Sequence, residues 1–364
     1  MANKIFDVLY LHIGLEKTGT TSIQHVLDRN RDRLATAGVF LPRSLGQENH
    51  KTLAAYGFDA GSRDIAVTSQ GIGAAEAEVQ TFRSQVETAL EKEIAASTAT
   101  RAIISSEDLS RLFRPHEVAR VLQLLQRFCK QLRVIVFLRR QDLLASSRHY
   151  SLVLGGGRPG QVFPAADAPG QRYYDYNALL TPWIDQLGAD HIDLLRFPET
   201  PAAEAFDSPR AFARLTGIDL SDFDLGRRQH SSYDAVNQLI IHNFNALQQG
   251  YDPQATEALM QQLQAHNQPG MAHIPSAAQA REFYQRFSAG NAALLARLGA
   301  EAQGFSEEAQ GFSEDFSMYP DHNMRQAYMA QAIQRLLQIR ASAGSAGQNP
   351  VRTRSDTDRS ENAV

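Results

Sequence analysis

The feature that most constrains the fold is a short apolar run that ends in a glycine turn and is followed by a helical pattern. Residues 8–14 read Val-Leu-Tyr-Leu-His-Ile-Gly, which is typical of a buried central strand. After a turn at residues 14–19, residues 20–37 carry apolar side chains at helical spacing. A strand that leads directly into a helix is half of a βαβ unit, so the pattern predicts a parallel sheet covered by helices.

The same alternation continues to about residue 200. Further strands are predicted at residues 39–42, 101–106, 132–138 and 192–197, and helices at residues 51–56, 76–95, 115–130, 139–154 and 176–187. Beyond residue 208 the patterns are helical, at residues 209–216, 235–248, 253–266, 278–298 and 322–339. The fold class expected is therefore α/β, a three-layer sandwich with a central parallel β-sheet and a largely helical C-terminal half.

The chain of 364 residues fits one large domain. We expect this domain over residues 1–340, with a core half at 1–200 and a helical part at 205–340. Residues 341–364 contain almost no large apolar side chains, which predicts a disordered tail. The heptapeptide at residues 301–307 is repeated at 308–314, and such a single duplication indicates a loop insertion.

Composition excludes several classes of function. The net charge of −4 argues against a general nucleic-acid binder, although a small anion could still bind in a local basic pocket. A single cysteine, Cys129, excludes an intramolecular disulfide and a cysteine-based zinc site. No apolar run approaches the ~18–20 residues of a membrane span, and the first residues lack the features of a signal peptide. We expect a cytoplasmic protein.

The turn after the first strand has the composition of an anion cradle. Residues 11–22 read Leu-His-Ile-Gly-Leu-Glu-Lys-Thr-Gly-Thr-Thr-Ser. Backbone N–H groups and a helix N-terminus favour a phosphate there, Lys17 adds a mobile charge, and Thr20 and Thr21 add hydroxyl donors. It is not a Walker A loop, because Lys17 precedes Gly19 by two residues and Thr20 stands where the lysine belongs. The alternative is a Thr/Gly-rich turn with no ligand.

The order Lys-Thr-Gly-Thr-Thr resembles the 5′-phosphosulfate loop of the sulfotransferases that use 3′-phosphoadenosine 5′-phosphosulfate (PAPS). That family has a fold like that of the P-loop NTPases. The resemblance implies that the 5′ end of PAPS is bound by Lys17, Thr18, Gly19, Thr20, Thr21 and Ser22.

A second motif of the family is matched later in the chain. In sulfotransferases an Arg at the end of a later strand and a Ser eight residues on hold the 3′-phosphate, and Arg139 and Ser147 stand at that spacing. Arg140 and Ser146 are the alternatives one residue away. An arginine fork matches phosphate oxygens in pairs, and eight residues return Ser147 to the face of the first helical turn.

The resemblance covers residues 8–154 and departs from the cytosolic aryl and steroid enzymes at two points. Their glycine-rich C-terminal loop is not visible, and Ser22 stands where they have an aromatic residue. Both departures point to a divergent carbohydrate-type or bacterial-type branch. The activity implied is transfer of a sulfuryl group from PAPS to a hydroxyl of a small-molecule or glycan acceptor, by in-line displacement and without a metal.

Such a reaction needs a cation near the bridging oxygen and a base on the acceptor hydroxyl. Lys17 is the natural cation. Glu107 leads as the base because it follows the strand predicted at 101–106, at the edge where α/β sheets bind ligands. The alternative for Glu107 is a helix-capping acid. His50, in the loop after the second strand, is the second candidate base, although a lone loop histidine is more often merely solvated.

Other residues and functions stay open at this stage. The acceptor site is expected from the loops at residues 43–75 and 155–170 and from parts of the helical C-terminal half. Trp183 fits packing or acceptor stacking equally well. His12 and Cys129 are expected in the core, and His149 on the surface. A non-catalytic nucleotide-binding scaffold is the main alternative function; an altered P-loop kinase is less favoured, since the Walker A order is missing.

Overall fold

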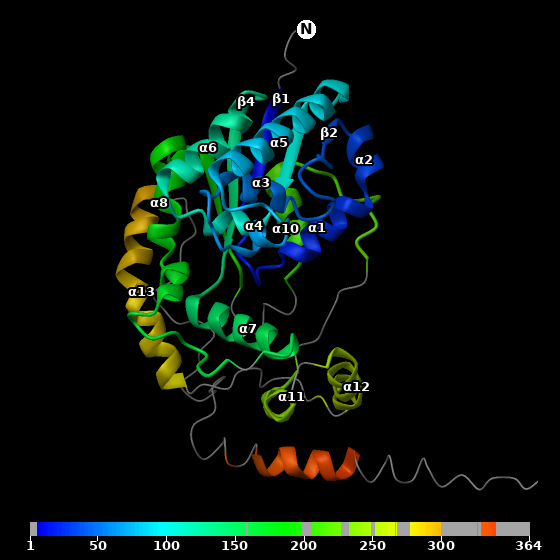
Figure 1. Ribbon diagram of the computed structural model, residues 1–364, viewed down its shortest axis with the longest axis vertical. Coiled ribbons are helices and arrows are strands. Elements are labelled where there is room, and N and C mark those ends of the chain that lie inside the picture. The colour runs from blue at the N-terminus through cyan, green and yellow to red at the C-terminus, as the bar shows by residue number, and fades with distance from the viewer. Residues whose placement is uncertain are drawn as a thin grey trace, which may run out of the picture.

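The computed structural model describes residues 6–157, 159–198, 206–226, 233–248, 252–265, 267, 277–299, 326 and 329–339. Within these residues, five parallel strands form one sheet in the order β2-β3-β1-β4-β5 (Figure 1). The strands are β1 (Phe6–His12), β2 (Val39–Phe40), β3 (Arg101–Ser105), β4 (Cys129–Leu138) and β5 (Ile192–Arg196). Each lies where an apolar segment predicted it, so the predicted α/β class with a parallel sheet is confirmed.

Most helices lie where the sequence pattern predicted them; a short helix at residues 65–68 lies in the stretch 43–75, where only the helix at 51–56 was expected. The helices are α1 (Thr20–Arg29), α2 (Arg31–Thr36), α3 (Lys51–Gly57), α4 (Ile65–Thr68), α5 (Glu76–Ala96), α6 (Pro115–Gln126), α7 (Gln141–Leu154), α8 (Tyr176–Leu187), α10 (Ser208–Thr216), α11 (Ala235–Leu247), α12 (Pro253–Gln264) and α13 (Ala277–Leu298). Short 3₁₀ turns lie at η1 (Glu107–Arg111), η2 (Pro169–Tyr174) and η3 (Ala189–His191). Residues 329–339 are also helical.

Two helix boundaries differ from the prediction. The helix predicted at residues 20–37 is interrupted at Asn30, whose amide donates to the carbonyl of Val26 at 2.8 Å and to that of Asp224 at 2.9 Å. These bonds tie the break to a distant segment, which local spacing could not reveal. The helix predicted to reach residue 130 ends at Gln126, and Cys129 begins β4 in a half-buried position.

The two faces of the sheet pack against different helices, which gives the three layers. On β4, Val134 and Val136 point into the larger apolar cluster, with side chains of α3, α5, α6 and α8. Ile135 and Phe137 point to the opposite face, against α1, α2 and α10. This alternation is the period-two pattern of a strand buried on both faces.

The helical second half adds packing beyond the sheet. Helices α7, α11 and α12 and residues 329–339 share a smaller apolar cluster that includes Val153, Ile241, Leu263 and Ala332. Helix α13 lies along α8 and also contacts α7 (Figure 1). The heptapeptide repeat at residues 301–314 and the tail predicted at 341–364 lie outside the described residues.

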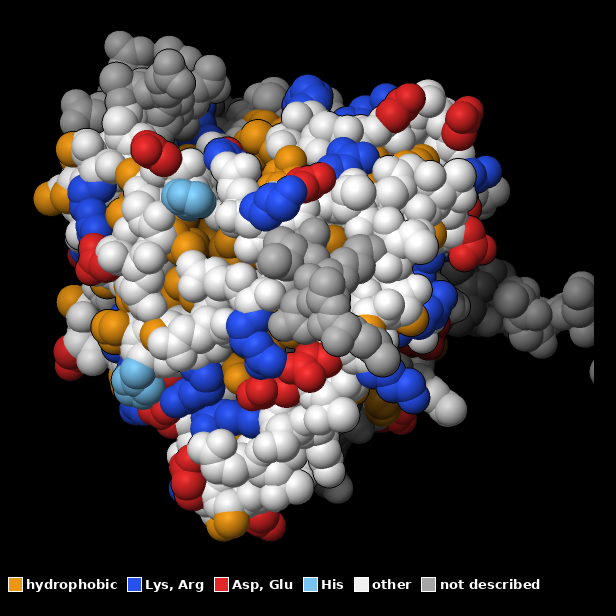
Figure 2. All heavy atoms as spheres, turned by 90° about the horizontal axis from the view of Figure 1, so that it is seen from above, with side chains coloured by type: hydrophobic (Ala, Val, Ile, Leu, Met, Phe, Trp, Pro, Cys, Tyr) orange, Lys and Arg blue, Asp and Glu red, His pale blue; other side chains and the backbone are white. Residues whose placement is uncertain are grey.

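The surface has a mixed charge where the strands begin. On the face seen from above in Figure 2, Lys and Arg side chains lie beside Asp and Glu side chains. No helix among the described residues combines the length and the apolar character needed to cross a bilayer.

Candidate functional site

The residues singled out from the sequence gather at one edge of the sheet, where the strands end. The turn at residues 13–19 follows β1, Glu107 follows β3, and Arg139 follows β4. Strand β1 lies at the point where the strand order reverses, since the chain goes first to β2 and β3 on one side and then to β4 and β5 on the other. Open α/β sheets bind their ligands at such a point, outside the carboxyl ends of the strands.

Two glycines shape the turn after β1. Gly14 and Gly19 have φ angles of 84° and 86°, in the left-handed region that glycine tolerates. A Cβ atom on Gly14 would lie 2.7 Å from Cα of Glu107, so glycine lets η1 pack directly on the turn. A side chain on Gly19 would overlap Ser208 at the start of α10. The close packing of three segments thus depends on the two missing side chains.

Lys17 also adopts a left-handed conformation, with a φ of 62°. A non-glycine residue there costs on the order of 1 kcal/mol or more, so its surroundings must hold it. Nη1 of Arg139 donates to the carbonyl of Lys17 at 3.2 Å, and Oγ1 of Thr18 donates to the carbonyl of Leu15 at 2.7 Å. The N–H of Glu16 donates to the Tyr173 hydroxyl at 3.3 Å. The bend that presents Lys17 is therefore fixed on both sides.

The charge on Lys17 is set by opposing influences. Burial lowers its pKa most, the neighbouring Glu16 raises it, Arg139 lowers it and Glu107 raises it. The ammonium group thus lies between one positive and two negative side chains.

The hydroxyls of the turn fall into two groups. Thr18 and Thr20 are buried, and Thr18 is bound to the backbone of the turn. Thr21 and Ser22 are exposed in the first turn of α1. Of the hydroxyls predicted to bind an anion, Thr21 and Ser22 are therefore accessible, and Thr18 stabilises the turn.

Arg139 and Arg140 point to different parts of the molecule. The guanidinium of Arg139 contacts the turn and lies 5.3 Å from the centre of the Phe197 ring. The guanidinium of Arg140 pairs with Asp142 at 3.1 Å and lies 3.9 Å from the centre of the Tyr284 ring. The structure thus brings Arg139, and not Arg140, to the turn.

The two serines on α7 differ in exposure. Ser147 is half-buried, whereas Ser146 is buried. Of the two, Ser147 is the more accessible to a ligand.

Glu107 is half-buried beside the turn. Nε2 of Gln24 donates to its Oε2 at 2.8 Å, and Gln24 also reaches Oγ of Ser105 at 3.4 Å. Burial raises the pKa of the Glu107 carboxyl, with the Gln24 hydrogen bond opposing it. A carboxylate with a raised pKa is suited to accept a proton near neutral pH.

His50 is completely buried, and backbone groups take both of its ring nitrogens. The N–H of Ser105 donates to Nδ1 at 2.9 Å, so Nε2 carries the proton and donates to the carbonyl of Pro42, also at 2.9 Å. Burial lowers the pKa of His50 to about 4. Neither ring nitrogen is available to an acceptor. This arrangement argues against the catalytic role predicted for His50 and supports a structural role instead.

The burial of several other side chains decides between the roles predicted for them. Trp183 is fully buried in α8, so it packs in the core and does not stack on an acceptor. His12 is buried between Phe137 and Phe212, as expected. His149, expected on the surface, is buried and its ring stacks on His242. Within the described ranges, no three His, Cys, Asp or Glu side chains come together as metal ligands.

The structure adds residues that sequence reasoning missed. Phe197 follows β5 and lies near both Arg139 and Gly19. Gln24 holds Glu107, and Oγ of Ser208 donates to the carbonyl of Gly19 at 3.3 Å. Phe197 could have been found, because it ends a strand at the same edge of the sheet. Gln24 and Ser208 act through tertiary contacts that give no local signal.

Comparisons with known proteins give fold-level likenesses only. No family model matches the chain, and no curated protein matches it in sequence. A sulfotransferase from Alicyclobacillus acidocaldarius is 15% identical over 71% of this chain and 96% of its own, with a TM-score of 0.37. The sulfotransferase domain of the Synechococcus PCC 7002 olefin synthase is 13% identical over 79% and 97%, with a TM-score of 0.33. That of the curacin biosynthetic pathway is 12% identical over 78% and 98%, with a TM-score of 0.32. At these values we base no conclusion on the likenesses.

Proposed function

We propose that this protein is a sulfotransferase that moves a sulfuryl group from PAPS to a hydroxyl of a small-molecule or glycan acceptor. The observation that supports this most is the 3.2 Å contact between Nη1 of Arg139 and the carbonyl of Lys17. Two motifs that lie far apart in the sequence meet there. PAPS carries a phosphosulfate and a separate 3′-phosphate, so a protein that binds it needs two anion sites side by side.

The residues present fit both anionic ends of PAPS. In this proposal the turn at residues 14–22 binds the 5′-phosphosulfate through its backbone N–H groups, Lys17, Thr21 and Ser22. The fork of Arg139, with Ser147, binds the 3′-phosphate. The hydroxyl of Thr18 is bound to the backbone of the turn, so this side chain shapes the turn rather than contacts the anion.

Transfer would proceed by in-line displacement. The acceptor oxygen forms a bond to sulfur as the bond between sulfur and the bridging phosphate oxygen breaks, and the electron pair stays on that oxygen. The ammonium of Lys17 stabilises the charge that grows on the leaving phosphate. Glu107 takes the proton of the acceptor hydroxyl, for which its raised pKa suits it. None of these roles calls for a metal, and location in the cytoplasm stays a prediction.

Labelled sulfate provides the test of turnover. We expect transfer of label from PAPS to a hydroxyl acceptor in a panel of glycans and small alcohols, and tight binding of 3′,5′-adenosine bisphosphate without acceptor. Lys17→Ala should weaken that binding by tenfold or more, since it removes a partly buried charge-assisted contact worth about 1.5–3 kcal/mol. Bisphosphate binding without turnover on any acceptor would favour the scaffold alternative. Magnesium-dependent binding of ATP in preference to the bisphosphate would favour a kinase.

A further inference from the structure

A carboxylate lies directly beside the proposed anion site. Glu16 precedes Lys17 in the turn, and its side chain keeps 27% of its surface exposed. A negative charge at this position repels an incoming phosphate or sulfate, because like charges interact strongly in a partly buried site. Neutralising the charge of Glu16 therefore strengthens the attraction of the turn for an anion.

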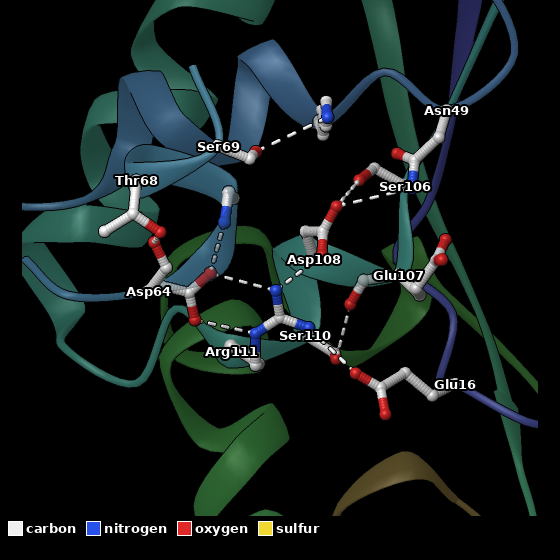
Figure 3. A network of polar contacts seen from close by, with 12 residues as sticks. Glu16, Asn49, Asp64, Thr68, Ser69, Ser106, Glu107, Asp108, Ser110 and Arg111 are labelled. Atoms are coloured by element: carbon white, nitrogen blue, oxygen red, sulfur yellow. Dashed lines mark hydrogen bonds and ion pairs between the residues drawn. The ribbon is translucent and has the colours of Figure 1, made fainter. Parts of the chain in front are cut away.

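Two arginines from different elements bind the two oxygens of Glu16. Nη1 of Arg111, in η1, lies 2.9 Å from Oε1, and Nε of Arg148, in α7, lies 3.0 Å from Oε2. Figure 3 shows Arg111 reaching Glu16 from the 3₁₀ turn that also carries Glu107. Each carboxylate oxygen thus has its own guanidinium.

The two arginines are not equivalent. Arg111 also binds Asp64, at 2.7 and 2.9 Å, and Asp108, so three carboxylates share its charge (Figure 3). Among the described carboxylates, Arg148 pairs only with Glu16, and its guanidinium lies 4.4 Å from the centre of the Tyr173 ring. Its charge is therefore the one that offsets Glu16.

We propose that Arg148 is a charge-compensating residue that neutralises Glu16 and so allows the turn to bind an anion. The inference rests on the proposed function, since it takes the turn at residues 14–22 as the anion site. Arg148 acts through Glu16 and is a positioning residue. The side chain of Glu16 links the turn to η1 and α7, and the backbone N–H of Glu16 donates to the Tyr173 hydroxyl next to the strained Lys17.

Calorimetric titration with 3′,5′-adenosine bisphosphate at low salt tests this role. Arg148→Gln should weaken binding about tenfold, because it leaves Glu16 with Arg111 alone, whose charge Asp64 and Asp108 share. Adding Glu16→Gln to that variant should restore affinity to within about threefold of wild type, and Arg148→Lys should also bind nearly as wild type. The loss in Arg148→Gln should shrink at high salt, which screens the exposed part of the interaction.

Arg127 offers a matched control. It pairs with Glu87 and Glu91, and its guanidinium lies 5.3 Å from the centre of the Phe128 ring, much as Arg148 lies over Tyr173. It precedes β4 and so lies at the opposite end of the sheet from the turn. Arg127→Gln makes the same change in net charge and should leave the affinity unchanged.

Two results would overturn the inference. One is an affinity of Arg148→Gln equal to that of wild type. The other is a double variant, Arg148→Gln with Glu16→Gln, that binds as weakly as Arg148→Gln although circular dichroism and thermal melting show that it is folded. Titration with inorganic pyrophosphate distinguishes a failure of this inference from a failure of the proposed function. If wild type binds pyrophosphate but not the bisphosphate, and the variants show the expected pattern with pyrophosphate, compensation stands and PAPS is wrong. If wild type binds neither anion, both proposals fail.

Discussion

Two titratable side chains lie beside the end of β3, the half-buried Glu107 and the buried His50, and they have different hydrogen-bond partners. Glu107 begins η1, two residues after the last residue of the strand, and His50 lies just before α3 with Nδ1 bound to the N–H of Ser105. Gln24 binds one oxygen of Glu107, whereas backbone groups take both nitrogens of His50. Burial beside the same strand end thus produces one group that can still accept a proton and one that cannot.

The difference lies in the sign of the burial effect and in the kind of partner. Burial disfavours the charged form, so it raises the pKa of Glu107 and lowers that of His50 to about 4. A raised carboxylate pKa approaches the range of a general base, while a lowered imidazole pKa leaves a neutral ring. Residue type at a strand end is therefore a weak guide to catalysis, and the hydrogen-bond partners decide.

The largest expected effect is on the rate of sulfuryl transfer, which should depend on Glu107 and not on His50. Glu107→Gln removes the proposed base but keeps size and polarity, so the sulfuryl-transfer rate should fall by ~10²–10⁴. Bisphosphate affinity should stay within about threefold of wild type. The rate is measured with labelled PAPS under saturating donor. A variant that turns over as fast as wild type would remove Glu107 from the mechanism.

The next effect is on the stability of the folded protein and concerns His50. His50→Leu leaves the N–H of Ser105 and the carbonyl of Pro42 without their partner, which should lower the free energy of unfolding by about 1–3 kcal/mol. The transfer rate per folded molecule should stay close to wild type. Urea denaturation measures the free energy of unfolding, and an assay of the active fraction measures the transfer rate per folded molecule. A rate as low as that of Glu107→Gln, with unchanged stability, would return His50 to the site.

A third effect concerns the pH dependence of unfolding. The pKa of His50 is about 4 in the folded protein against 6.5 in the free side chain, so unfolding takes up a proton between these values. Stability is complete above pH 6.5 and is lost as the pH falls toward 4, by about 3 kcal/mol for this residue. The decrease should be smaller by that amount in His50→Leu. The buried His12, with its pKa lowered to about 3, acts in the same direction in both proteins. Identical pH profiles for the two proteins would contradict the assignment.

Much of the fold was accessible from the sequence because periodicity reports burial. Apolar runs fixed the five strands, and helical spacing fixed α5, α8 and α13 to within a residue or two at each end. The strand order and the break at Asn30 were not accessible, since both depend on contacts between distant segments.

The candidate site was accessible only in part. The turn around Lys17 was predicted from its local composition, and Arg139 from the resemblance to the second sulfotransferase motif. The structure supplies the contact that joins them, together with the ion pair between Glu16 and Arg148 and the hydrogen bond from Gln24 to Glu107. His50 was a candidate base because the local sequence does not show how its loop folds. In the structure that loop places both ring nitrogens against backbone groups.

The preference for a 3′-phosphate tests the central claim most directly. Calorimetry compares the affinities for 3′,5′-adenosine bisphosphate and adenosine 5′-monophosphate in wild type, Arg139→Met and Arg140→Met. The account predicts that wild type and Arg140→Met prefer the bisphosphate by tenfold or more, which is about 1.4 kcal/mol or more, and that Arg139→Met loses this preference. A preference that persists unchanged in Arg139→Met, or none in wild type, would contradict it.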